Sequence, residues 1–60
     1  DRVIMSLRSE KYHVQNMVKE VVEDLDGYGG GHEHACGANI SKEDYPRFIS
    51  RLKEKIENAS

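Results

Sequence analysis

The N-terminal residues alternate between apolar and polar side chains. Every second side chain between positions 3 and 7 is apolar: Val3, Met5 and Leu7. The intervening positions form a second row: Arg2, Ile4, Ser6 and Arg8. Alternation with a period of two, together with branched residues, is typical of a half-buried strand. We therefore predict a strand over residues 1–8, with Ser6 and Arg8 side by side at its C-terminal end.

A helical pattern follows the polar residues 9–13, which we interpret as a turn. Apolar residues recur at i, i+3, i+4, i+7 and i+11: Val14, Met17, Val18, Val21 and Leu25. This spacing places them on one face of a helix, with charged residues on the outer side. Asn16 is a candidate N-cap, although the helix could also begin two residues earlier. Gly27 is placed where a left-handed residue would end the helix.

Glycine dominates residues 27–31, where four of five residues are glycine in a chain that has only 5. Glycine loses more conformational entropy on folding than any other residue, so such a cluster needs a reason. Successive main-chain N–H groups in a glycine-rich turn form a concave, electropositive nest that suits phosphate or carboxylate. We predict an anion-binding loop here, followed by a short buried strand over residues 36–40.

The last segment predicts a second helix. Its apolar stripe is regular: Tyr45, Phe48, Ile49, Leu52 and Ile56. Ser41 and Asp44 resemble a capping box before this stripe. Pro46 disfavours helical geometry at the residue before it, so we expect the main helix to run from about residue 46 to residue 58.

The predicted order is strand, helix, strand, helix, which is an α/β unit. A strand–helix–strand unit of this length favours parallel pairing through a right-handed crossover. Ligands of such sheets bind beyond the carboxyl ends of the strands, where Ser6, Arg8 and Ser9 would lie. The glycine loop would then lie near the opposite edge unless it folds back over the sheet. Two strands alone are marginal, so we expect a third strand from elsewhere in a larger sheet domain, or a homodimer.

Composition narrows these possibilities. Sixty residues allow one small domain, and a first residue other than Met suggests a piece of a longer protein. The 9 basic and 11 acidic residues give a net charge of −2, which excludes a generic polycation that holds nucleic acid by bulk charge. The single cysteine predicts a reducing, cytoplasmic setting. No apolar run approaches the roughly 20 residues that cross a bilayer, so we expect no membrane contact.

Two features point to the same anionic ligand. Arg8 can grip a phosphate or carboxylate with two N–H groups, helped by the hydroxyls of Ser6 and Ser9. The alternative is that Arg8 binds no ligand and is a solvated arginine at the end of a strand. The backbone of Gly29, Gly30 and Gly31 supplies N–H donors, and His32 could donate to the phosphate or stack on a base.

A zinc module is the alternative that the histidines suggest. His32, His34 and Cys36 would share one face of an extended strand. Three ligands spaced two apart do not match the common structural zinc spacings, and no second ligand pair lies elsewhere. We therefore predict no metal ligands in this chain and interpret Cys36 as a small buried apolar residue.

Two motifs resemble a known family over nearly the whole chain. Residues 6–9 read Ser-Leu-Arg-Ser, and residues 29–37 read Gly-Gly-Gly-His-Glu-His-Ala-Cys-Gly. This order is similar to the C-terminal half of the DHH-associated domain. That domain follows the catalytic domain in RecJ-type single-strand-specific exonucleases, in nano-RNA and cyclic-dinucleotide phosphodiesterases and in related phosphoesterases. Cys36 stands where the family usually has alanine. Alanyl-tRNA synthetases carry a related domain whose loop pattern fits less well.

The resemblance implies a substrate-binding module that is itself catalytically inert. Carried over by position, Ser6, Arg8 and Ser9 would contact phosphate, and residues 29–32 would close around phosphate and sugar or base. The implied partners are single-stranded DNA or RNA, or a short oligonucleotide, and a catalytic DHH domain of the same parent chain. That missing domain would bind two Mn²⁺ or Mg²⁺ ions and hydrolyse the phosphodiester, whereas this chain would bind no cofactor.

Other functions stay open at this point. The substrate could be a cyclic dinucleotide or a nano-RNA rather than a longer strand. The chain could instead be a structural or oligomerisation domain whose glycines only satisfy a tight turn, which its negative charge and thin core would suit. In that case a Gly30→Ala substitution should unfold it, while Arg8→Ala should leave ligand behaviour untouched.

Overall fold

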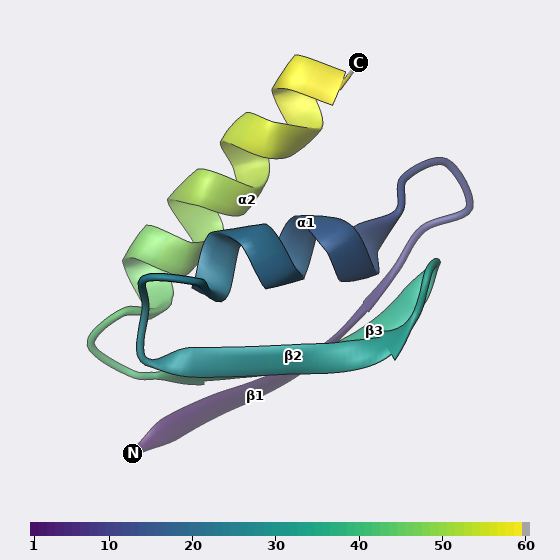
Figure 1. Ribbon diagram of the computed structural model, residues 1–60. Helices are drawn as coiled ribbons and strands as arrows, with labels where there is room; N and C mark the ends of the chain where they lie inside the picture. Colours follow the sequence, from purple (N-terminus) through teal and green to yellow (C-terminus); the bar gives the residue numbers. More distant parts are fainter. Residues whose placement is uncertain (60) are drawn as a thin grey trace.

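The structure is a computed structural model, and it describes residues 1–59; position 60 lies outside the described residues. The elements follow in the order β1 (Arg2–Arg8), α1 (Val14–Val22), β2 (Gly27–His32), β3 (Ala35–Ser41) and α2 (Tyr45–Ala59). Figure 1 shows both helices on one face of the sheet, with the other face uncovered. The predicted α/β class is confirmed.

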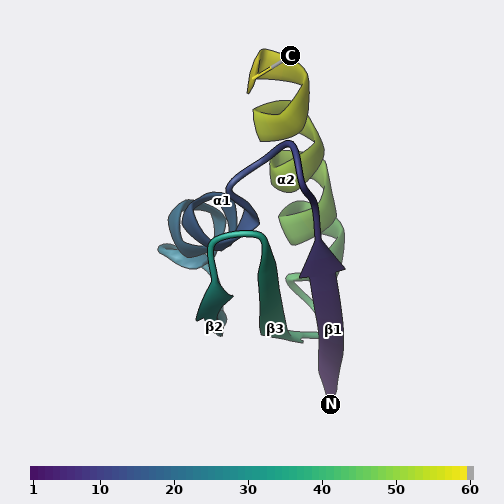
Figure 2. The same ribbon diagram turned by 90° about the vertical axis from the view of Figure 1, so that its right-hand side faces the viewer.

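The sheet has three strands in the order β1-β3-β2, and β3 is antiparallel to both neighbours. The predicted parallel pairing is therefore wrong. A turn of only two residues joins β2 to β3, and so short a connection allows only antiparallel pairing. β1 and β2 do run in the same direction, as the helical crossover requires, but β3 lies between them (Figure 2).

The glycine-rich stretch is a strand and not a loop. Residues 27–32 form β2, which pairs with β3 from Gly27 opposite Ile40 to His32 opposite Ala35. This strand supplies the third member of the sheet, so the prediction that another segment or a second copy supplies it is wrong. Because β1 and β2 run in the same direction, their C-terminal residues lie at the same end of the sheet, on the two sides of β3. Arg8 and His32 both lie opposite Ala35, on either side of β3.

The core lies between the sheet and the helices. Its buried apolar residues come from both layers: Val14, Val18, Val21, Cys36, Ala38, Ile40, Phe48 and Leu52. Phe48 and Ile40 are 0 % exposed and are among the largest fully buried side chains. Met5 and Leu7 of β1 pack against this cluster from the same side. The predicted apolar row of residues 3–7 therefore does face the core.

The helix boundaries differ from the prediction for local reasons. α1 begins at Val14 after His13, which makes no capping hydrogen bond with its side chain, and it ends at Val22. Gly27 therefore belongs to β2 and does not end the helix. α2 begins at Tyr45 and includes Pro46 in its first turn, where a missing N–H costs little.

Half of the predicted capping box forms before α2. The backbone N–H of Asp44 donates to the hydroxyl of Ser41 over 3.3 Å. The carboxylate of Asp44 instead accepts the backbone N–H of Asp26 over 2.8 Å, which ties the start of α2 to the residue before β2.

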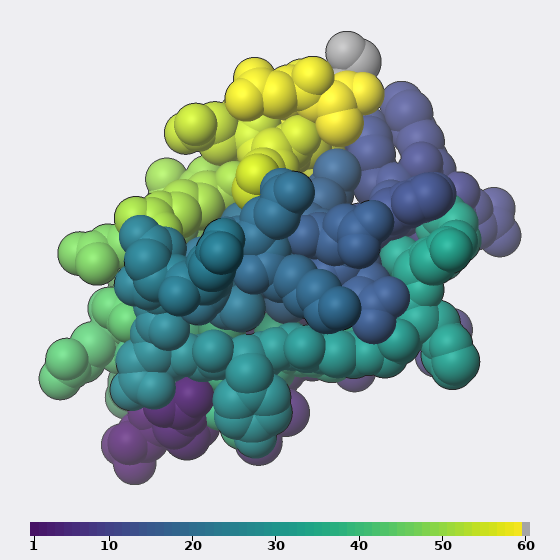
Figure 3. All heavy atoms as spheres, in the orientation of Figure 1, coloured from purple at the N-terminus to yellow at the C-terminus, as the bar shows by residue number. Residues whose placement is uncertain are grey.

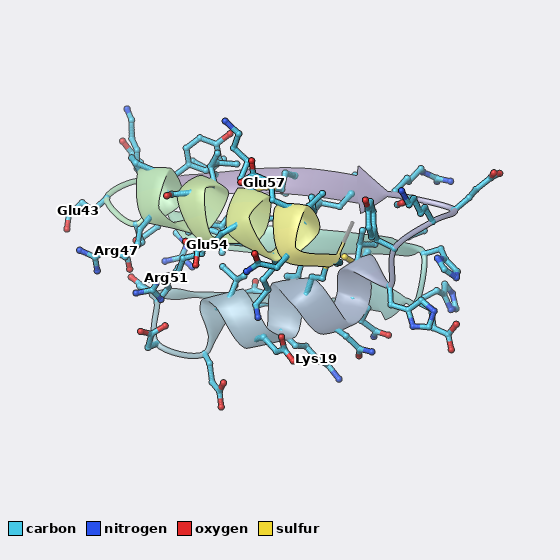
Figure 4. All side chains as sticks on the ribbon, turned by 90° about the horizontal axis from the view of Figure 1, so that it is seen from above. Lys19, Glu43, Arg47, Arg51, Glu54 and Glu57 are labelled. Carbon is cyan, nitrogen blue, oxygen red and sulfur yellow. The ribbon has the colours of Figure 1, made fainter. Side chains whose placement is uncertain are left out.

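Charged side chains cover the outer surfaces of the helices. Figure 4 labels several of these side chains, such as Arg47, Glu54 and Glu57 on α2 and Lys19 on α1. Two ion pairs link α2 to α1 and to the residues just after it: Lys55 to Glu20 over 2.6 Å, and Arg51 to Asp24. Figure 3 shows α1 packed directly against β2. Among the described residues, no helix is long and apolar enough to cross a membrane.

Candidate functional site

The uncovered face of the sheet gathers the predicted site residues in cross-strand rows. Pairing through β3 defines each row as a residue of β1, its partner in β3 and the partner of that residue in β2. The first row is Arg8, Ala35 and His32, the second is Ser6, Gly37 and Gly30, and the third is Ile4, Asn39 and Tyr28. We call this surface the open face.

Two adjoining depressions hollow the open face. One of about 180 Å³ is lined by Ser6, Arg8, Gly30, Gly31 and Gly37 with neighbouring backbone. The other, of about 370 Å³, has lining residues from the third row and shares Ser6, Gly30 and Gly37 with the first. We call the two together the groove. Glycines face each other across its centre, so a ligand could reach the backbone there without meeting a side chain.

Gly30 has no structural reason to be glycine. A Cβ added at this position would meet nothing within 4 Å, and its φ lies outside the left-handed region. Gly37 opposite it is similarly tolerant, because a Cβ there would lie 3.6 Å from the carbonyl oxygen of Met5, an ordinary van der Waals distance. These two glycines keep the floor of the groove bare.

The neighbouring glycines of β2 serve packing instead. A Cβ at Gly29 would lie 2.4 Å from Cγ1 of Val18 on α1, so only glycine allows the helix to lie this close. Gly31 has a φ of 141°, and a Cβ there would lie 2.7 Å from the carbonyl oxygen of Ala35. Gly31 also borders the groove, whereas Gly29 borders only its larger half.

Arg8 differs from the arginine at the other end of the same strand. The guanidinium of Arg2 donates to Asn39 Oδ1 over 2.7 Å and to Asp26 Oδ1 over 3.0 Å. The guanidinium of Arg8 has no hydrogen-bond or ion-pair partner among residues 1–59. Both side chains lie on the open face. The groove therefore ends at an unpaired cation, and the opposite end of the face holds a paired one.

Ser9 and His32 lie beside the groove and do not line it in the described residues. The Ser9 hydroxyl accepts the backbone N–H groups of Lys11 and Tyr12, over 3.2 and 3.0 Å, and so shapes the turn before α1. His32 is exposed at the end of β2, in the row of Arg8. Ligand contacts of either residue stay a prediction.

The residues of the zinc alternative are separated by the hairpin. His32 ends β2 on the open face, His34 lies in the turn, and Cys36 faces the helices in β3. The three do not share one extended strand, so the premise of that alternative is wrong. Burial raises the pKa of the Cys36 thiol, which keeps it neutral and a poor nucleophile at neutral pH.

Sequence reasoning missed the apolar border of the groove. Ile4 and Tyr28 are the most exposed large apolar residues of the described chain, at 78 % and 67 %, and they flank Asn39 in one row. The Tyr28 hydroxyl accepts a long hydrogen bond of 3.4 Å from Asn39 Nδ2. The signal was available, because Ile4 is the apolar member of the otherwise polar row of β1.

The groove thus combines a free guanidinium, a hydroxyl, bare backbone and a small apolar border. This combination suits binding of an anion with an attached organic group, and it lies on one face of a small α/β domain. The chain matches the DHHA1 domain over residues 1–58, and it belongs to this family, which is associated with DHH phosphoesterases. Searches of curated proteins and of solved structures find no match.

Proposed function

We propose that this chain is the substrate-binding part of a DHH phosphoesterase and that its groove holds a phosphate of single-stranded nucleic acid. A catalytic DHH domain in the same parent chain would hydrolyse the phosphodiester, and the parent would be an exonuclease or phosphodiesterase. The chain would form the C-terminal part of the DHH-associated domain and would be inactive alone. We place the parent in the cytoplasm because Cys36 is a free thiol.

The observation that carries the proposal is the bare floor beside an unpaired guanidinium and a hydroxyl. Gly30 and Gly37 leave space that packing does not require, and Arg8 and Ser6 stand beside it. Guanidinium groups bind phosphate through two N–H groups at once, and charge-assisted hydrogen bonds of this kind are the strong ones. The family's association with phosphoesterases supports the same ligand.

The larger half of the groove favours a nucleotide over free phosphate. Ile4 and Tyr28 present apolar surface next to Asn39, and this row lies two residues along β1 from Ser6 and four residues from Arg8. An aromatic ring offers a stacking surface for a base, and stacking accepts any base. His32 could contribute a second ring or a donor at the other end. A cyclic dinucleotide or a nano-RNA would fit the same description, and this is the second candidate substrate.

The groove does not suit the catalytic metals. Mn²⁺ and Mg²⁺ prefer clustered carboxylates and other oxygen ligands, whereas the groove offers a guanidinium, a hydroxyl and glycines. We therefore assign these ions to the proposed DHH domain and no catalytic step to this chain.

A binding titration with matched arginine variants tests the proposal. A fluorescently labelled tetranucleotide, as DNA and as RNA, is titrated with the chain at low salt and followed by anisotropy. Arg8→Ala should weaken binding roughly tenfold to a hundredfold, because it removes a charged hydrogen-bonding group. Arg2→Ala is the control, since it removes the same charge from the same strand and face, and it should change affinity less than about twofold.

Salt dependence gives a second readout of the same complex. If one or two phosphates are held, log affinity should fall against log salt with a slope of roughly −0.7 to −1.4. Equal effects of the two arginine variants would contradict the proposal, as would a complete lack of binding to both polymers and to dinucleotides. The structural alternative would then stand.

A further inference from the structure

A second group of side chains lies at the end of the sheet where β2 turns into β3, outside the groove. His13 precedes α1, and Glu33 and His34 form the turn between β2 and β3. One ligand atom from each of these three residues lies within 4.8 Å of the others. Nothing in the proposed binding of phosphate uses them.

His34 is held in the tautomer that a metal needs. Its Nδ1 lies 3.0 Å from the carbonyl oxygen of Tyr12, and a carbonyl can only accept, so Nδ1 carries the proton. In the neutral ring Nε2 then has a free lone pair, and this atom lies 3.9 Å from Glu33 Oε2. Metal-binding histidines usually donate their other N–H to a carbonyl or carboxylate in this way.

The second imidazole faces the first. The rings of His13 and His34 have centroids 4.9 Å apart and stand at 89° to each other. His13 and Glu33 are exposed and His34 is half-buried, so their side chains can turn without disturbing the core. Around zinc, ligand atoms about 2.0–2.2 Å from the ion lie roughly 3.4 Å apart in a tetrahedron. The three atoms therefore need to approach one another by only about 1.4 Å.

We propose that His13, Glu33 and His34 bind a zinc ion, with a water molecule in the fourth position. Two imidazole nitrogens and one carboxylate oxygen form a set that suits zinc better than Mg²⁺ or Ca²⁺. This site is distinct from the metals assigned to the DHH domain, and it does not depend on the proposed function.

The backbone already holds the two segments together. The N–H of Gln15 donates to the carbonyl of Glu33 over 3.3 Å, and the N–H of Ser9 donates to the carbonyl of His34 over 3.0 Å. The turn is thus fixed against Ser9 and the first turn of α1 before any ion binds, which lowers the ordering cost of binding. Zinc would clamp this edge, next to the row that contains Arg8 and His32.

The test measures the binding of zinc alone to the full 60-residue chain. Competition with a chromogenic chelator gives stoichiometry and affinity, and the absorption of Co²⁺ as a substitute reports the coordination number. We expect one ion per chain, a tetrahedral Co²⁺ spectrum, and a rise in Tm of at least about 4 °C at saturating zinc.

Variants identify the ligands. His13→Ala and His34→Gln should each weaken zinc binding at least about tenfold, because each removes one of three ligands. His13→Ala is the safer variant for folding, since its side chain makes no capping hydrogen bond. His32→Ala is the matched control, because it removes the histidine at the end of β2 and should change affinity less than about threefold.

Three outcomes would overturn the site. These are sub-stoichiometric zinc, an octahedral Co²⁺ spectrum, or a loss of binding in His32→Ala that equals the loss in His13→Ala. The last result would show that His32 is among the ligands.

Discussion

The two faces of the sheet use glycine for opposite reasons. On the covered face, Gly29 lets α1 approach so closely that a single methyl group would collide with Val18. On the open face, Gly30 meets nothing, although it is the next residue of the same strand. Packing explains the first glycine completely and the second not at all. A glycine that packing does not require is a better indicator of a ligand site than a cluster of glycines taken together.

The largest expected effect is on the covered face. Gly29→Ala should lower the free energy of unfolding by at least about 1–3 kcal/mol, because it forces a methyl group into a packed layer. A 60-residue domain rarely has more than about 3–5 kcal/mol, so this loss would remove a large share of the stability of the domain. Urea denaturation followed by circular dichroism measures the change. A variant as stable as the parent would show that α1 does not lie this close to β2.

Gly30→Ala sharpens the comparison from the open face. Its stability should equal or slightly exceed that of the parent, by up to about 0.4–1 kcal/mol, because alanine restricts the unfolded chain. Oligonucleotide affinity should nevertheless fall several-fold, since the methyl group stands on the floor of the groove. The same denaturation and anisotropy measurements separate the two quantities. Unfolding of this variant would support the purely structural alternative.

The smallest effect concerns the ion pair between Arg51 of α2 and Asp24, which follows α1. The Arg51 guanidinium donates a hydrogen bond to Asp24 and holds the pKa of that carboxyl below its usual range. The pair therefore contributes stability at a pH above the ordinary aspartate pKa, about 3.9, and this is lost as the pH falls through the lower pKa of the folded state. Tm measured from pH 6 to pH 2 should fall less steeply in Arg51→Gln. Identical profiles would show that the pair is absent in solution.

Much of the fold could be predicted from periodicity. Alternation identified β1 and its buried row, and helical spacing identified both helices within a few residues. The glycine strand could not be found this way, because glycine has low strand propensity and carries no side chain to show a period. Missing that strand also produced the error in pairing. Without β2, the strand after the first crossover is predicted at residues 36–40, and a strand reached through a helical crossover is expected to run parallel to the first strand.

The placement of the glycines next to Arg8 was predicted, but for a loop and not for the strand that the structure shows. We expected glycine amides in a loop to meet Arg8, and instead a strand places Gly30 and Gly31 beside the same depression as Ser6 and Arg8. Ser9 was expected to face the ligand, but its hydroxyl accepts two backbone N–H groups in its own turn. Hydroxyl residues at turns often bond to nearby backbone, and sequence alone does not separate that use from ligand binding.

The most direct test of the account is where a phosphate-bearing ligand binds. A short single-stranded oligonucleotide is added to the ¹⁵N-labelled chain, and amide chemical shifts are followed by NMR. We predict that the largest shift changes fall on Ser6, Arg8, Gly30, Gly31 and Gly37. The amide shifts of residues around Arg2 and Asp26 should stay unchanged. Changes centred on Arg2, on the outer faces of the helices or nowhere at saturating ligand would contradict the account.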